Sequence, residues 1–259
     1  MAVVPVPDHR TDTSRRVPFT GGVSRAFGFT PRQLLRILVF TTATLTVLGA
    51  VADRLTRFDP DPAFLPSRFD LLREGNVPTW FASGLWALAA LLAGRLSIGG
   101  RRLGTPHHRT WGFLAAVFLF CSIDEGAQFH EPMSEWMGSL QDASPVLAHA
   151  WVVPYAVASV LVGLKSWQLL RSLPAPVFRL LVLAGVVYVG GAIGFELVES
   201  VFVAEGKDTL VKSLVATSQE VVEMIGLDLL VFALAVMLDG TLAAEWSHGD
   251  PDVGQRLSS

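Results

Sequence analysis

Residues 111–131 have the sequence WGFLAAVFLFCSIDEGAQFHE, and this stretch decides the fold class. The segment from Trp111 to Cys121 carries no charge and has the composition of a membrane helix. It is followed immediately by three carboxylates and an imidazole, at Asp124, Glu125, Glu131 and His130. Ionisable side chains are costly at the edge of a hydrocarbon layer and rarely occur there without a use. The stretch therefore predicts a membrane helix with a functional site at one end.

The composition of the whole chain supports a membrane protein. Its 259 residues are 51% hydrophobic and only 17% charged, whereas soluble domains carry about 25% charged residues. The apolar residues occur in long blocks, which indicates an all-α polytopic membrane protein. The single cysteine, Cys121, excludes an intrachain disulfide and a cysteine-based metal site. We expect membrane lipids as partners, no nucleic acid, and a location in the inner (cytoplasmic) membrane of a bacterium.

Six apolar segments are long enough to cross a bilayer. We expect them at about 33–52, 79–98, 110–131, 149–169, 178–203 and 218–238. Pro132 disfavours helix at the preceding residue, so the third span should end or bend at Glu131. In the fifth span, the spacing of Gly190 and Gly194 should let another helix backbone approach closely. The predicted organisation is a disordered cytoplasmic tail at 1–30, a six-helix transmembrane domain at 31–240 and a flexible cytoplasmic tail at 241–259.

The distribution of basic residues predicts the orientation, because cytoplasmic loops are rich in Lys and Arg. With six spans and both termini cytoplasmic, fourteen of the 20 Lys and Arg residues fall in inner segments and six in outer loops. On this topology, four consecutive helices carry acidic or imidazole side chains at the same outer level. These candidate metal ligands are Asp124, Glu125, His130, Glu131, His149, Glu196, Glu199, Glu220 and Glu223.

Such a concentration of carboxylates needs cations to balance it. Oxygen-rich ligation with one or two imidazoles suits Fe, Mn or Mg, and some four-helix bundles hold two iron or manganese ions with inward carboxylates. We therefore predict a divalent-metal centre with two ions of Fe or Mn. The chain lacks the Glu-x-x-His pattern of those bundles, so the comparison is an analogy of ligand chemistry alone.

Several of these residues also have a purely structural interpretation. Carboxylates at helix ends can be hydrated residues of the membrane interface, and Glu220 and Glu223 would suit the positive end of a helix dipole. Asp228, deeper in the sixth span, would relay protons or bond a neighbouring helix. Glu74 and Asn76 precede the second span; either they cap that helix, or their loop closes over the acidic cluster. Trp80 suits the membrane interface.

Two motifs resemble an uncharacterised family of bacterial multi-pass membrane proteins. They are Glu74-x-Asn76-x-Pro78-Thr79-Trp80 before the second span and Ser122-x-Asp124-Glu125-x4-His130-Glu131 at the end of the third. The resemblance implies a helical membrane fold with a shared site on the outer face, and it implies no substrate. The chain does not closely resemble membrane ceramidases or CAAX-type proteases, because it lacks their helical pairs of histidines.

The predicted function is that of a metal-dependent membrane enzyme at the extracytoplasmic boundary. Its substrate would be a lipid or a quinone-like molecule, and its chemistry that of an oxidoreductase or a hydrolase. A cation- or proton-coupled transporter would use the same acids for an ion in transit, although transporters usually bind near the bilayer midplane. A third alternative is an accessory or structural subunit of a larger membrane complex or homo-oligomer, in which the acids would diverge in space.

Overall fold

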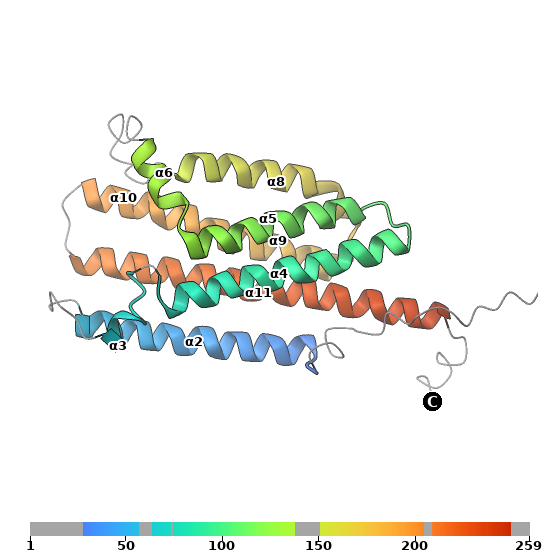
Figure 1. Cartoon of the computed structure of the whole chain (residues 1–259), viewed down its shortest axis with the longest axis horizontal. Helices are drawn as coiled ribbons and strands as arrows, with labels where there is room; N and C mark the ends of the chain where they lie inside the picture. Colours follow the sequence, from blue (N-terminus) through green and yellow to red (C-terminus); the bar gives the residue numbers. More distant parts are fainter. Residues whose placement is uncertain (1–27, 57–63, 74, 138–150, 205–208, 250–259) are drawn as a thin grey trace, which may run out of the picture.

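A computed structural model of the chain describes residues 28–56, 64–73, 75–137, 151–204 and 209–249 (Figure 1). All regular elements in these ranges are helices, which confirms the predicted all-α class. In chain order they are α2 (Pro31–Thr56), α3 (Phe64–Ser67), α4 (Val77–Arg102), α5 (His108–Ala127), α6 (His130–Trp136), α8 (Val152–Ser172), α9 (Ala175–Val189), the π-helix η3 (Gly190–Phe195), α10 (Glu196–Ala204) and α11 (Thr209–Gly249). The long helices lie side by side in an elongated bundle (Figure 1).

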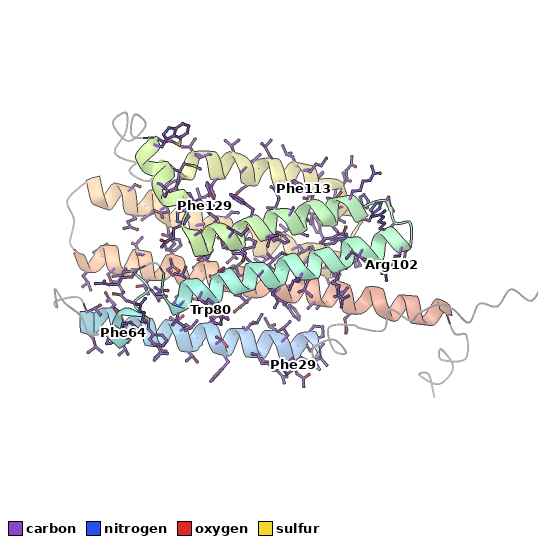
Figure 2. The ribbon with its side chains drawn as sticks, in the orientation of Figure 1. Phe29, Phe64, Trp80, Arg102, Phe113 and Phe129 are labelled. Carbon is purple, nitrogen blue, oxygen red and sulfur yellow. The ribbon has the colours of Figure 1, made fainter. Side chains whose placement is uncertain are left out.

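Six helical stretches of the described residues are long and apolar enough to cross a membrane. They are Pro31–Thr56, Val77–Arg102, His108–Ala127, Val152–Ser172, Ala175–Ser200 and Ser213–Asp239. About 20 apolar residues of helix cross a bilayer, so the chain is a multi-pass membrane protein. Trp80 lies near the start of α4 and is 75% exposed, and Arg102 lies at the opposite end of that helix (Figure 2). The orientation of the bundle, with both termini in the cytoplasm, stays a prediction.

Helix α11 occupies the centre of the bundle and packs against α2, α4, α9 and η3. Its side chains Leu227, Val231 and Leu234 are completely buried. In the same core cluster α4 contributes Ala89 and Ala93, also completely buried, and such small side chains let helices approach closely. Many apolar side chains of α2 and α8 are exposed instead, as expected for helices that face lipid.

A close approach of helix backbones joins α11 to the continuous stretch of α9 and η3. A Cβ atom added at Gly226 would lie 2.8 Å from the backbone nitrogen of Tyr188, and one at Gly191 would lie 3.0 Å from Cγ of Glu223. At Gly190 and Gly194 a Cβ atom would meet no other atom within 4 Å. The predicted contact through Gly190 and Gly194 is therefore wrong. Residues 190–195 form a π-helix, and its wider turn changes which residues share a face.

The boundaries of the third and the sixth spans differ clearly from the prediction. The third span ends at Ala127, because Gln128 adopts a left-handed conformation with φ of 57°. Pro132 lies instead in the first turn of α6, where its missing N–H breaks no helical hydrogen bond, so the predicted break at Glu131 is misplaced. The last helix begins at Thr209 and continues to Gly249, which extends it beyond both ends of the predicted span.

Hydrogen bonds of polar side chains connect neighbouring helices and cap the start of α4. Thr42 Oγ1 donates a hydrogen bond of 2.9 Å to Oδ2 of the buried Asp228, so Asp228 bonds the neighbouring helix α2. Ser83 and Ser122 each donate a hydrogen bond to the other's backbone carbonyl, at 2.8 and 2.9 Å, and so join α4 to α5. Asn76 Oδ1 accepts a bond of 2.8 Å from a backbone N–H in the first turn of α4, which confirms the predicted cap.

The close approach at Gly226 leads to a stability prediction. We expect Gly226→Ala to lower the free energy of unfolding by about 1–3 kcal/mol, because an added methyl group forces the two backbones apart. Gly190→Ala is the matched control, since it adds the same atom into open space, and it should change stability by less than about 0.5 kcal/mol. Thermal unfolding of each variant in neutral detergent measures the difference, and equal stabilities would contradict the close approach.

Candidate functional site

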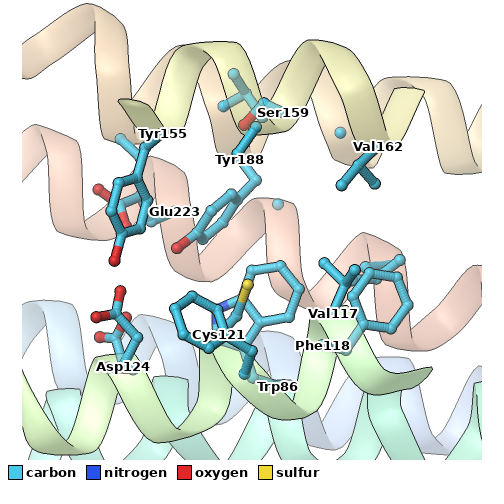
Figure 3. A pocket seen from close by; sticks show the side chains of 18 of the residues that line it. Trp86, Val117, Phe118, Cys121, Asp124, Tyr155, Ser159, Val162, Tyr188 and Glu223 are labelled. Carbon is cyan, nitrogen blue, oxygen red and sulfur yellow. The ribbon is translucent and has the colours of Figure 1, made fainter. Parts of the chain in front are cut away.

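A cavity of about 570 Å³ lies in the bundle and is lined by residues of α4, α5, α6, α8, α9, η3, α10 and α11 (Figure 3). Most of its wall is apolar and includes Trp111, Leu114, Phe118, Val162, Leu181 and Leu234. On α5 the lining extends from Trp111 to Glu125, which is about 21 Å at 1.5 Å per residue. Because the acidic side chains lie at one end, the cavity is a long apolar chamber with an acidic end.

Six of the nine predicted site residues line this cavity: Asp124, Glu125, His130, Glu196, Glu220 and Glu223. They come from α5, α6, α10 and α11, so helices that are distant in sequence meet here. Glu199 is not among the described lining residues, although it shares α10 with Glu196. His149 and the side chain of Glu131 lie outside the described part of the chain.

The turn after α5 brings His130 back onto Asp124. The left-handed conformation of Gln128 ends α5, and α6 then starts at His130. His130 Nδ1 lies 3.4 Å from Oδ2 of Asp124. Six residues apart on an uninterrupted helix, these two side chains would face different directions. The pairing therefore depends on the turn.

Asp124 is held at a defined depth in the bundle. It is only 7% exposed, and the reciprocal hydrogen bonds of Ser83 and Ser122 fix α5 two residues before it. The serine of the Ser122-x-Asp124-Glu125 motif thus positions the carboxylates that follow it. Such a buried carboxylate differs from the hydrated interfacial residue that a helix end could have provided.

Glu220 and Glu223 lie well inside α11, eleven and fourteen residues after its first residue, Thr209. A helix dipole acts on charges within the first turn, so the interpretation of these acids as dipole partners is wrong. Glu223 lies within electrostatic range of Glu125, Glu196 and Glu220. Four carboxylates from three helices therefore share the acidic end of the cavity.

Three aromatic rings surround the same end. The ring centroids of His130 and Trp151 are 5.1 Å apart, and those of Trp151 and Tyr155 are also 5.1 Å apart. The planes of Trp151 and Tyr155 meet at 85°, so the two rings form a corner. Sequence reasoning missed Trp151 and the clustering of the three rings. The available signal was the spacing of four residues between Trp151 and Tyr155, which a helix places on one face.

Among the polar atoms of the cavity wall are several that are buried and have no hydrogen-bond partner of normal geometry among the described residues. They include Asp124 Oδ1, Tyr155 Oη, Trp86 Nε1 and Ser166 Oγ. Figure 3 shows the Tyr155 hydroxyl pointing across the cavity toward Asp124. Buried polar groups are nearly always satisfied by protein, water or a ligand. The wall therefore includes several buried polar atoms whose hydrogen bonds the described residues do not complete.

The described acidic side chains do not form a ready-made metal centre. Over the ranges that the structure describes, no group of three or more His, Cys, Asp or Glu side chains is arranged to hold a metal ion. The acids share one end of the cavity without converging on one point. Two predicted ligands, His149 and Glu131, are not available for this test, so the two-metal centre stays a prediction.

A family model described as a domain of unknown function (DUF8692) matches residues 37–238 of the chain. The chain belongs to DUF8692. The matched part of this DUF8692 protein begins in α2, ends in α11 and contains every residue that lines the cavity. No curated protein and no solved structure matches the chain. Membership of DUF8692 thus assigns the cavity to the family's domain and assigns no activity.

The turn at Gln128 can be tested by substitution. Glycine adopts the left-handed conformation without strain, so Gln128→Gly should keep the stability of the protein. A β-branched residue is strongly disfavoured there, and Gln128→Val should lower the free energy of unfolding by about 1–3 kcal/mol. Thermal unfolding of both variants in neutral detergent gives the comparison. If valine and glycine behave alike, the turn does not have this conformation.

Proposed function

We propose that this DUF8692 protein binds a lipid-like or quinone-like molecule inside its bundle and acts on the polar end of that molecule. The observation that carries the proposal is one chamber that joins an apolar wall to an acidic end. The chamber extends for about 21 Å along α5. A molecule with a long apolar part and a polar end is complementary to both regions.

The polar end of the ligand would provide the selectivity. An apolar chain that leaves the bilayer for the cavity exchanges one apolar environment for another, so the chain by itself does not select one lipid among many. Contacts with the buried polar atoms of Asp124, Tyr155 and Trp86 have no counterpart among lipid tails. These contacts would therefore distinguish the bound molecule from the surrounding lipids.

The pair of His130 and Asp124 suits proton transfer at that polar end. A carboxylate beside Nδ1 favours the tautomer with its proton on that nitrogen, which makes Nε2 a proton acceptor. Such a carboxylate–imidazole pair is a common general base in enzymes, and its separation of 3.4 Å is within the range found before a substrate is bound. We therefore propose an enzyme, with hydrolase or oxidoreductase chemistry, and His130 as its proton acceptor.

Metal dependence is a second candidate, favoured by the excess of carboxylates in the cavity. Five carboxylates line it, at Asp124, Glu125, Glu196, Glu220 and Glu223, and no Lys or Arg is among the described lining residues. Divalent Fe or Mn would supply the missing positive charge. The centre would need rearrangement of these side chains or a contribution from Glu131 or His149, since the described residues hold no suitable group.

The other two alternatives have less support. A transporter usually binds its cargo near the middle of the membrane span, whereas these acids lie at one end of the cavity. An accessory subunit with acids at a hydrated surface would let them diverge, whereas six of the nine predicted residues line one cavity.

Binding of a ligand in the chamber can be tested with a substitution that fills the chamber with a larger side chain. Val162 lines the cavity, so Val162→Trp should displace a lipid-like molecule that copurifies with the protein. Leu164 is 69% exposed and lies on the same helix, which makes Leu164→Trp the matched control. Mass spectrometry of organic extracts from the purified proteins should find one molecule strongly reduced in the Val162 variant alone. Extracts that are identical for all three proteins would contradict the proposal.

The metal candidate has its own experiment. Elemental analysis of the purified protein should find Fe or Mn in stoichiometric amounts, and the double variant Glu196→Ala/Glu223→Ala should lose it. Glu199→Ala is the control, because Glu199 shares α10 but is not among the described lining residues. Protein without stoichiometric metal in any of the three forms would exclude the metal-dependent candidate and leave the proposed ligand binding untouched.

A further inference from the structure

We infer that the acidic end of the cavity recognises an organic cation, so that the ligand is an amphiphile with an ammonium group on a long apolar chain. This inference rests on the proposed function, because it specifies the polar end of the molecule that the chamber would bind. It follows from three features of that end: its charge, its aromatic rings and its unpaired buried atoms.

The charge of the lining selects the sign of the head group. Among the described lining residues, Asp124, Glu125, Glu196, Glu220 and Glu223 carry carboxyl groups, and no Lys or Arg accompanies them. A phosphate or carboxylate head would meet like charges in a medium of low dielectric constant, where repulsion is strong. An ammonium head would instead be attracted by these carboxyl groups.

The aromatic cluster favours an organic cation over a bare metal ion. Trp151 and Tyr155 meet at 85° with ring centroids 5.1 Å apart, and His130 lies 5.1 Å from Trp151 and 6.4 Å from Tyr155. The faces of Trp and Tyr attract ammonium groups within about 6 Å, and such rings are the usual surroundings of quaternary ammonium ligands. Metal coordination, which needs converging ligands, is not found among the described acids.

Unpaired polar atoms point to a ligand independently of charge. Asp124 is 7% exposed, and its Oδ1 has no hydrogen-bond partner of normal geometry among the described residues. Tyr155 Oη, also without such a partner, points toward this carboxylate from the opposite wall (Figure 3). A cation beside this pair would be attracted by the carboxylate and by the adjoining rings.

The test compares probes that share one chain and differ in the head. Tetradecyltrimethylammonium, tetradecanol and tetradecyl phosphate are each added to the purified full-length protein in neutral maltoside micelles, and native mass spectrometry measures the bound fraction. We expect the ammonium compound to bind about tenfold more tightly than the alcohol and the phosphate to bind least. Tetramethylammonium, which has the head without the chain, should bind much more weakly than the long-chain ammonium.

Variants separate the head site from the chamber. Trp151→Leu and Asp124→Asn should each lower the affinity for the ammonium probe several-fold and leave tetradecanol within twofold. Val162→Trp should lower the affinity for both probes, and Leu164→Trp should affect neither. Retained tetradecanol binding shows that the head-site variants are folded, so a loss of the ammonium probe alone supports the inference.

The possible failures are distinguishable. If ammonium, alcohol and phosphate bind equally well, or if the phosphate binds best, the cation inference is overturned while the proposed amphiphile binding stands. If tetramethylammonium binds as tightly as the long-chain compound, the site takes a soluble cation and the amphiphile is wrong. If no probe of tetradecyl length binds, both the inference and the proposed function fail.

Discussion

Carboxylates inside an apolar helical bundle are the constraint on which the rest of this structure depends. A bilayer offers no water to solvate them, so each needs a partner or a neutralising charge. In this chain five carboxylates line one end of a cavity, and the described lining residues include no Lys or Arg. The fold gathers these groups from three helices beside one cavity, where a single bound molecule would meet all of them.

The packing around α11 provides the rigid frame for this end. Gly226 and Gly191 let α11 pack closely against the stretch of α9 and η3. This packing places Glu223 of α11 within electrostatic range of Glu196. The serine pair joins α4 to α5 and fixes the depth of Asp124. Helix α8 closes the opposite wall with its aromatic residues. The acidic end is therefore built by helices that are held together by backbone contacts and side-chain hydrogen bonds.

Sequence patterns predicted the six spans because hydrophobic length is a property of local segments. They also predicted that acids of separate spans meet, and six of the nine candidates do line one cavity. They failed where the local helix departs from the regular repeat. The π-helix at Gly190–Phe195 moved the close contact from Gly190 and Gly194 to Gly191. The left-handed Gln128 ended α5 early and turned His130 onto Asp124.

The amino-acid sequence by itself determined the membrane class, the number of spans and the residue types at the acidic end. Each of these follows from composition along a single segment. Only the tertiary structure decided which acids line the cavity: Glu196 does, and Glu199 is not among the described lining residues. It also decided that Trp151 and Tyr155 form a corner beside the acids. The long apolar chamber that continues from the acidic end likewise became apparent only in the structure. These features depend on how helices rotate and approach one another. The rotation of each helix about its axis depends here on close contacts at glycines and on irregular turns. A sequence pattern based on a regular helical repeat does not predict these features.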